Sequence, residues 1–587
     1  MKTETGRESP PLRIAGVLSI TFFLCAAALP AMAHTGDLAE CVPADAMMYA
    51  SWDFSKDVEA NYRKSALHKF LQEEEVIKFM ERAMEKADIL EPGDREAPVS
   101  REEAWKLAHS RLALWISDIE TKKVKVTDEE SGEYEYEEEI VTGGIIAEFL
   151  TDDAKKAARK IIKFAQEEAA KEENITRQIV DYKKVKIKHY KSEDGGDFKE
   201  ACFFEIDGKY VVTSSLSEAK KIIRLMKGEE VESLARSRLY KKTLENLSRD
   251  RVITGFMNLE AIFKKYEKEM FEDEMGKRAF EFIRLGDAKA VGLGGVAAES
   301  RLALELYVYT PATNSPLFQL FRNGRARFNC MELVKRDALT AIAGTINPLD
   351  CWGFYKQSAR LFDEDSYKES MDALKEFEKE SKLSLDKDLL ANIGTEAVVI
   401  IPDAAIDLTS GVPLGVVLAV QIKDRDRVEK FIRAAIAHGG GEMEEAPYRG
   451  YKILGSGESV FFCFTRKYWL IGSSDTAIKE VIKTLKGDRP LLVNSEKYRR
   501  ARRKIEGDIT AVGYINLARF FEMVNSLVKN LAQRDFGAPF DEESREHGEK
   551  NAQPTLFPVD LLKKYFPSVL AGLKVDNDGM LLKALAP

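Results

Sequence analysis

Residues 214–228 of this chain read SSLSEAKKIIRLMKG, and residues 473–487 read SSDTAIKEVIKTLKG, which aligns with the first stretch without a gap. In both, paired serines precede an amphipathic run that ends in Lys-Gly. This is the pattern of a helix capped by serine and stopped by glycine. Because the pattern recurs so far along a chain of 587 residues, it indicates two copies of one structural unit.

The repetition extends beyond this helix, and its parts keep the same order. Residues 240–263 align without a gap on residues 498–521, and the strand pattern that begins at Gly144 resembles the one that begins at Gly415. Collinear matches of this extent predict a tandem duplication. The identical positions in the longer pair are Tyr240/Tyr498, Asp250/Asp508, Gly255/Gly513, Asn258/Asn516, Leu259/Leu517 and Phe263/Phe521.

Turn-forming residues separate the two copies. Residues 311–316 read PATNSP, a composition typical of a linker. We therefore expect a leader segment over residues 1–33, the first copy over residues 34–311 and the second copy over residues 317–587.

Strand and helix patterns are mixed within each copy. Alternating runs over residues 112–126 and 134–150 predict a hairpin that turns at Ser131-Gly132, and Asp207-Gly208 predicts a tighter one. Ser100 with Glu103 has the spacing of a helix capping box. Hairpins together with helical crossovers indicate an α+β fold with a mostly antiparallel sheet and packed helices.

The N-terminus has the pattern of a cleavable signal peptide. Basic residues precede an apolar run over residues 14–29, and Ala31-Met32-Ala33 supplies the small residues that a signal peptidase reads. This predicts cleavage after Ala33 and a periplasmic or secreted location. The run is shorter than the about 20 apolar residues of a membrane span, and residues 411–422 suit a buried strand, so we expect no transmembrane anchor after cleavage.

Charge and cysteine content exclude several classes of protein. A formal net charge of −9 gives no general attraction to nucleic acid, and the basic run over residues 497–504 fits a solvated helix face. The few cysteines cannot form a disulfide framework, although a bridge between Cys330 and Cys351 is conceivable; no CxxC pair is present. The cysteines expected in the mature chain are Cys41, Cys202, Cys330, Cys351 and Cys463.

No motif in the sequence identifies a catalytic, cofactor-binding or metal-binding residue. The histidines are scattered and HExxH is absent. Residues 455–459, GSGES, lack the order of a nucleophile elbow and fit a hairpin turn, and Gly439-Gly440-Gly441 fits the end of a helix. We therefore predict no site residue from sequence. The histidines after the leader are His34, His68, His109, His189, His438 and His547.

Asn258 and Asn516 form the most suggestive polar pair, since each lies where a strand pattern gives way to a helix pattern. They could belong to two related ligand sites. Asparagine is also among the preferred residues at a helix N-cap, and this interpretation explains their position fully.

The segment over residues 41–51, CVPADAMMYAS, together with the repeated strand–Ser-Ser–helix–Lys-Gly pattern, resembles a family of exported bacterial proteins catalogued only as a domain of unknown function. Members of that family start with a Leu- or Val-Pro-Ala-Asp segment. The resemblance implies an envelope location and a duplicated α+β fold over most of the mature chain. It implies no catalytic residues.

These features predict an exported, non-enzymatic protein that binds an envelope protein or an apolar ligand. One alternative is a structural or assembly factor of the envelope. Another is an envelope hydrolase whose site is assembled from distant residues, because such sites escape sequence reading.

Overall fold

The structure is a computed structural model. It describes residues 37–53, 56–79, 99–100, 103, 106–107, 110–128, 132–169, 174–192, 199–229, 231–270, 274–299, 301–311, 315–322, 327–345, 347–403, 415–456, 460–505, 507–533 and 556–586. The predicted leader, its cleavage site, His34, His109 and His547 lie outside these ranges. The chain forms two compact units: unit 1 comprises Met1–Lys69, Met84–Glu267 and Ala288–Tyr309, and unit 2 comprises Phe70–Ala83, Lys268–Asp287 and Thr310–Pro587.

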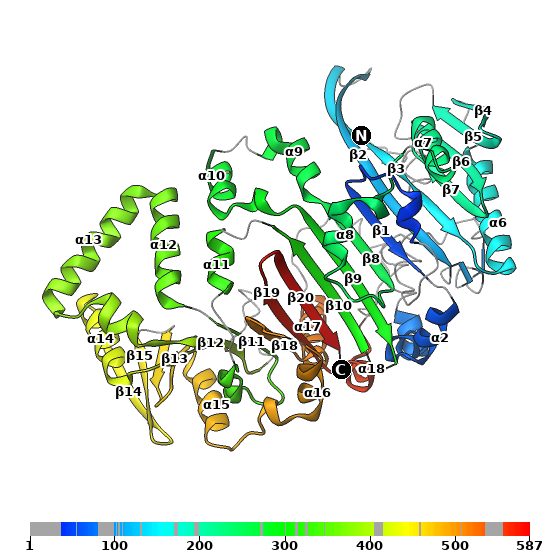
Figure 1. The fold of residues 1–587 in the computed structure, drawn as a ribbon. Helices are drawn as coiled ribbons and strands as arrows, with labels where there is room; N and C mark the ends of the chain where they lie inside the picture. Colours follow the sequence, from blue (N-terminus) through cyan, green and yellow to red (C-terminus); the bar gives the residue numbers. More distant parts are fainter. Residues whose placement is uncertain are drawn as a thin grey trace, which may run out of the picture. The chain divides into compact units, whose positions relative to one another are not determined.

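Unit 1 contains an antiparallel sheet with the strand order β4-β5-β6-β7-β3-β2-β1-β8-β9-β10 (Figure 1). Its strands are β1 Met48–Trp52, β2 Arg111–Asp128, β3 Gly132–Glu148, β4 Ile175–Tyr182, β5 Val185–Ser192, β6 Glu200–Ile206, β7 Lys209–Thr213, β8 Ile253–Asn258, β9 Ala290–Ala298 and β10 Arg301–Tyr309.

Unit 2 contains an antiparallel sheet with the order β14-β15-β16-β17-β13-β12-β11-β18-β19-β20. Strands β1 to β10 of unit 1 correspond in chain order to strands β11 to β20 of unit 2. Each strand has the same neighbours in its sheet as the corresponding strand of the other unit. The strands are β11 Thr340–Thr345, β12 Ile393–Ile401, β13 Val417–Ile422, β14 Met443–Tyr448, β15 Tyr451–Ser456, β16 Val460–Phe464, β17 Tyr468–Gly472, β18 Ala511–Ile515, β19 Val569–Val575 and β20 Gly579–Ala586.

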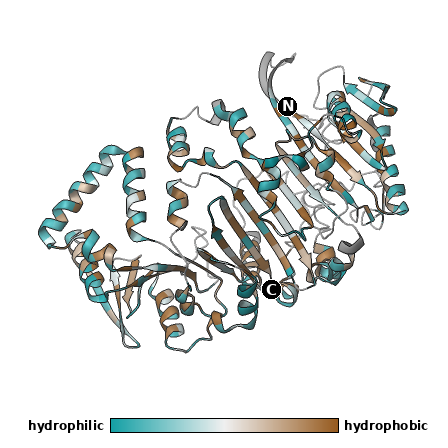
Figure 2. Ribbon diagram, viewed as in Figure 1, coloured by the Kyte–Doolittle hydropathy of each residue, from teal (hydrophilic) through white to brown (hydrophobic). Residues whose placement is uncertain are grey.

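Helices connect the strands, and the α+β class predicted from the sequence is confirmed. Hydrophobic residues gather on the strands, whereas α13 is mostly hydrophilic (Figure 2). The main helices are α2 Lys56–Lys64, α3 Ala66–Leu71, α6 Asp152–Ala169, α7 Leu216–Met226, α8 Arg238–Leu244, α9 Leu259–Met270, α10 Glu274–Ile283, α11 Pro316–Arg322, α12 Pro348–Phe362, α13 Glu364–Ser381, α14 Arg425–His438, α15 Asp475–Leu485, α16 Glu496–Lys504, α17 Leu517–Gln533 and α18 Val559–Tyr565.

Local signals in the sequence positioned several helix ends correctly. Ser100 and Glu103 form the capping box, because Glu103 N–H donates to Ser100 Oγ at 3.2 Å and Ser100 N–H donates to Glu103 Oε2 at 2.9 Å. Ser215 caps α7 by accepting from Glu218 N–H at 3.1 Å, and Ser474 caps α15 by accepting from Ala477 N–H at 3.2 Å. These bonds satisfy amide groups that the first turn of a helix leaves unpaired.

Two tight hairpin turns differ in how clearly their residue types predict them. Asp207-Gly208 joins β6 to β7 with φ values of 49° and 73°, as its composition predicts. Lys183-Lys184 joins β4 to β5 with φ values of 51° and 66°, although neither residue favours such angles. Strand β4 was not predicted from the sequence, because this turn lacks Gly or Asn and the strand itself is largely exposed.

Candidate functional site

A cleft of about 350 Å³ opens in unit 2. It lies where the start of α17 meets the segment before β11, the start of α16 and the segment between α18 and β19. Its size is at the small end of the about 300–1,000 Å³ typical of ligand pockets. The lining residues are Arg336, Ser495, Lys497, Tyr498, Tyr514, Asn516, Ala518, Arg519, Glu522, Lys563, Pro567 and Ser568.

Two of the four cations in this lining are already neutralised. Arg519 lies 3.3 Å from Asp337 Oδ2 and 3.4 Å from Asp403 Oδ1. Lys563 lies 2.9 Å from Glu522 Oε1, and Glu522 is itself part of the lining. These pairs fix side chains in the wall but leave little charge for a ligand.

Arg336 and Lys497 are the other two cations, and both are exposed. Within the part of the chain that the structure describes, neither forms an ion pair. Both positive charges are therefore available to a ligand in the cleft. The prediction that Lys497 lies on a solvated helix face is correct for α16 as a whole, but the sequence could not show that the first turn of α16 borders a cleft.

The buried wall of the cleft offers neutral hydroxyl groups. Tyr498 and Ser568 are each 8% exposed, and Tyr514 is 6% exposed. Burial raises the pKa of Tyr498 to about 12 and also raises the pKa of Tyr514, so both phenols keep their protons at neutral pH. The Tyr514 hydroxyl donates to the Arg336 carbonyl oxygen at 3.4 Å, so the two aromatic rings and Pro567 form a wall that contacts apolar groups.

Asn516 is part of the cleft lining and caps α17. Its Oδ1 atom accepts from Arg519 N–H at 3.1 Å, and Asn258 accepts from Ala261 N–H at 3.1 Å in unit 1. The N-cap interpretation is therefore confirmed for both asparagines. Because α17 starts at the cleft, the positive end of its dipole also favours an anion there.

The aligned positions of unit 1 lack these cations. Ala44, Leu239 and Ala261 align with Arg336, Lys497 and Arg519. Tyr240, which aligns with Tyr498, instead donates its hydroxyl to Asp37 Oδ2 at 2.9 Å. An anion site of this kind therefore belongs to unit 2.

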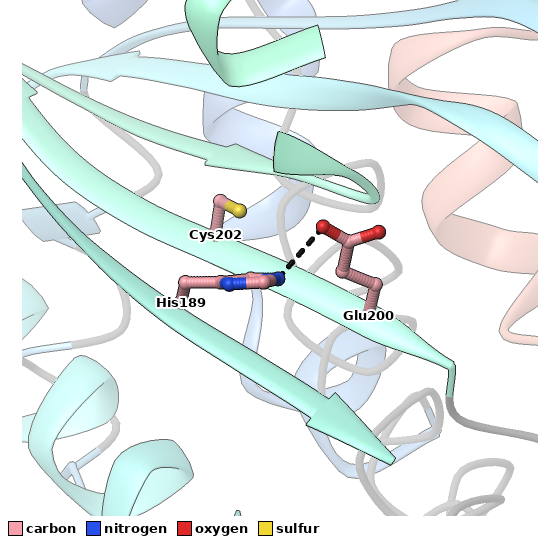
Figure 3. Close-up of side chains that lie close together, drawn as sticks. All are labelled: His189, Glu200 and Cys202. Carbon is pink, nitrogen blue, oxygen red and sulfur yellow. Dashed lines mark ion pairs between the residues drawn. The ribbon is translucent and has the colours of Figure 1, made fainter. Parts of the chain in front are cut away.

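Unit 1 has a different polar cluster, formed by His189 on β5 and by Glu200 and Cys202 on β6 (Figure 3). His189 Nε2 lies 2.7 Å from Glu200 Oε1, and the three ligand atoms lie within 4.8 Å of one another. His189 and Cys202 are direct cross-strand partners. The cluster was not predicted from the sequence, because the segment between β5 and β6 does not reveal which residues of the two strands pair.

This cluster does not have the features of a catalytic cysteine. Burial, reinforced by the Glu200 carboxylate, raises the pKa of Cys202 to about 12. A nucleophilic cysteine needs a lowered pKa, since the thiolate is the reactive form. All five cysteines of the described chain are free thiols, so the conceivable Cys330–Cys351 bridge is not formed.

Comparison with known proteins gives a family without an assigned function. Residues 302–587 match the family described as "Protein of unknown function (DUF3352)", which confirms the resemblance to a family of unknown function; the match covers the second half of the chain. No curated protein matches the chain. The described helices include none long and apolar enough to cross a membrane.

One similar solved structure is described as "Structure of crystal form I of TP0453". The two proteins share 11% sequence identity, and the alignment covers 45% of this chain and 80% of that one with a TM-score of 0.21. No conclusion about fold or function follows from so low a score.

Proposed function

We propose that this chain is an exported, non-catalytic binding protein of the bacterial envelope, built from two copies of one α+β unit. The signal-peptide pattern supports export, and the equal strand order of the two sheets supports the duplication. We further propose that the ligand is a small organic anion with an apolar portion and that it binds in the cleft of unit 2.

The pair of available cations in the cleft carries this proposal. Arg336 and Lys497 have no ion-pair partner among the described residues, and they border a wall of protonated phenols. Charge-assisted hydrogen bonds to a carboxylate, phosphate or sulfonate contribute about 1.5–3 kcal/mol each in a desolvated site, and less where, as for Arg336 and Lys497, the cation is exposed to water. The rings of Tyr498 and Tyr514 and the side chain of Pro567 would contact the apolar portion.

The same lining argues for binding rather than turnover. Its described residues include no histidine or cysteine, and its two tyrosines have raised pKa values. A general acid or base works best when its pKa lies near the operating pH. The one carboxylate among the described lining residues, Glu522, is paired with Lys563, so the lining favours holding an anion over proton transfer.

The test is a titration of the mature protein with anilinonaphthalene sulfonate, a probe that joins an anion to aromatic rings. We expect Arg336→Ala combined with Lys497→Ala to weaken binding at least about tenfold. The matched control is Arg499→Ala with Arg500→Ala, which removes the same charge from α16 outside the lining. Equal affinities for the two double variants would refute the proposal.

Native mass spectrometry of protein purified gently from its own envelope would then identify the natural ligand. An additional mass that disappears in the Arg336/Lys497 double variant and remains in the control variant would assign it to the cleft.

A second candidate function, docking of another envelope protein, is favoured by an apolar strip on the unit 2 sheet. Ile342 is 57% exposed and lies directly across from Val399, which is 38% exposed; Ile515, 41% exposed, lies on the neighbouring strand β18. Exposed apolar residues gathered in this way are typical of interaction surfaces. If a partner docks there, Ile342→Lys should abolish a cross-link formed in intact cells while leaving the thermal stability unchanged.

A further inference from the structure

The His189–Glu200–Cys202 cluster of unit 1 combines three kinds of metal ligand at one buried point. His189 is 5% exposed and Cys202 is fully buried, while the Glu200 side chain is 25% exposed. The imidazole, carboxylate and thiol converge from adjacent strands in Figure 3. None of the three residues belongs to the lining of the proposed anion cleft.

The Nε2 atom of His189 is not satisfied by its neighbours. Although Glu200 Oε1 is only 2.7 Å away, the atom has no hydrogen bond of acceptable geometry among the described residues. Glu200 Oε1 is instead aligned with the start of α7, where it accepts from Leu216 N–H at 2.7 Å. A buried ring nitrogen without an aligned partner is unfavourable, and a bound cation would satisfy it.

The opposite ring nitrogen faces an amide that can orient the histidine. The Nε2 atom of Gln178 lies 2.6 Å from His189 Nδ1. Rotation of this carboxamide by 180° turns its oxygen toward the ring, where it accepts the Nδ1 proton and leaves the His189 Nε2 lone pair facing Glu200 and Cys202. Such outer partners fix the tautomer and orientation of ligating histidines in metal sites.

We propose that these three side chains bind one Zn²⁺ ion, with water in the fourth position. Nitrogen, sulfur and carboxylate oxygen are the ligands that zinc takes in proteins. A tetrahedral ion with bonds of about 2.0–2.3 Å holds its ligand atoms about 3.3–3.8 Å apart. Here His189 Nε2 and Glu200 Oε1 are 2.7 Å apart and all three ligand atoms lie within 4.8 Å of one another, a range that includes the tetrahedral separations.

The second unit provides an internal comparison. Cys202 lies across from Thr213, and at the corresponding register Phe461 lies across from Gly472. The cross-strand partner of Phe461 is Gly455, where unit 1 has His189. Since neither Gly455 nor Phe461 can bind a metal, the site is specific to unit 1.

The test uses the full mature chain and Co²⁺ as a spectroscopic substitute for zinc. We expect one equivalent of Co²⁺ to produce the near-ultraviolet absorption of a thiolate–cobalt bond, and one equivalent of Zn²⁺ to displace it. The experiment requires no variant, so a folding defect cannot mask the result. Absence of this absorption in the wild-type protein would overturn the proposal.

Variants then assign the ligands. We expect His189→Ala and Cys202→Ser each to weaken Zn²⁺ binding more than about 100-fold in competition with a chelator, and Gln178→Ala to weaken it about 10–100-fold. Cys463→Ser is the matched control, because Cys463 is also a fully buried thiol on the corresponding hairpin of unit 2. Zinc affinity that is unchanged in Cys202→Ser, or equally reduced in Cys463→Ser, would refute the assignment.

Discussion

Lys335 is a buried cation whose removal should destabilise unit 2 in a pH-dependent way. The residue is 5% exposed, and its ammonium group lies 2.7 Å from Asp403 Oδ1 and 3.7 Å from Glu480 Oε2. Methionine has a similar length and no charge, so Lys335→Met keeps the packing of the stem and removes only the ion pairs.

The size of the stability loss depends on the solvation and the ion pairs that Asp403 and Glu480 keep in the variant. Removing one partner of a fully buried pair costs about 3–5 kcal/mol. The Asp403 side chain is 49% exposed, however, so water can solvate it in the variant, and Glu480 keeps Lys483 at 2.6 Å and Arg489 at 3.4 Å. After this discount for solvent screening, we expect a loss of about 2 kcal/mol in the free energy of unfolding at pH 7.

The stability lost in Lys335→Met should be smaller at low pH than at neutral pH. Burial opposes ionisation of Asp403 and Glu480, but hydrogen bonds to Lys335 and Lys483 and the neighbouring positive charges outweigh it and lower the pKa of each below its ordinary value of 3.8 or 4.5. A lowered pKa in the folded chain adds stability above the ordinary value, and this stability is lost as the pH falls through the lowered value. The difference between wild type and Lys335→Met should therefore shrink as the pH falls from about 5 to 3.

Urea denaturation of the mature protein at pH 7 and pH 3 measures both effects. The matched control is Lys368→Met, because Lys368 lies 3.3 Å from Glu364 and 3.7 Å from Asp365 but its side chain is 59% exposed. An exposed pair contributes about 0–1 kcal/mol, so the control should change little. Equal losses in the two variants, or a loss in Lys335→Met that is the same at both pH values, would refute this reasoning.

Other features of the fold give predictions of the same kind. Asn258→Ala and Asn516→Ala should each cost about 1 kcal/mol in urea denaturation, whereas serine at either position should restore the cap; a serine variant as unstable as the alanine variant would contradict the capping role. Trp115→Phe should cost about 1.5–3 kcal/mol because the indole N–H donates to the buried Glu218 carboxylate at 2.9 Å, and an unchanged unfolding midpoint would count against that bond. Gly144→Ala should cost about 3 kcal/mol, since the added Cβ would lie 2.4 Å from the Val212 carbonyl oxygen and 2.6 Å from the Trp115 ring; a stable alanine variant would show that the sheet can shift there.

Structure was predictable from the sequence where the decisive contacts lie within a few residues. The capping box at Ser100 and Glu103, the N-caps at Asn258 and Asn516 and the turn at Asp207-Gly208 are local structures whose donors and acceptors are near in the chain. The hairpin of β2 and β3 was also predictable, because the alternation of residue types along each strand determines which face is buried. Its predicted turn at Ser131 lies beside the described strand start at Gly132.

The polar sites could not be predicted in the same way because each depends on register or on distant segments. His189 and Cys202 become neighbours only through the pairing of β5 with β6, and no periodicity in the sequence sets that register. The cleft is more distant still, since Arg336, Lys497 and Lys563 come from separate segments of unit 2. Strand β4 was missed for a different reason: its turn at Lys183-Lys184 has backbone angles that lysine rarely adopts.

Comparison of the two units distinguishes residues that stabilise the fold from residues that could bind a ligand. Serines at the start of α7 and α15 and asparagines at the start of α9 and α17 play the same capping role in both units. The positions around Tyr240 and Tyr498, in contrast, have opposite electrostatics. Tyr240 donates to the Asp37 carboxylate at 2.9 Å, which would repel an anion, whereas Tyr498 borders Arg336 and Lys497, two cations without an ion-pair partner among the described residues. Since one scaffold supports either arrangement, the fold alone cannot specify the ligand, and the polar residues in which the units differ are the ones to mutate.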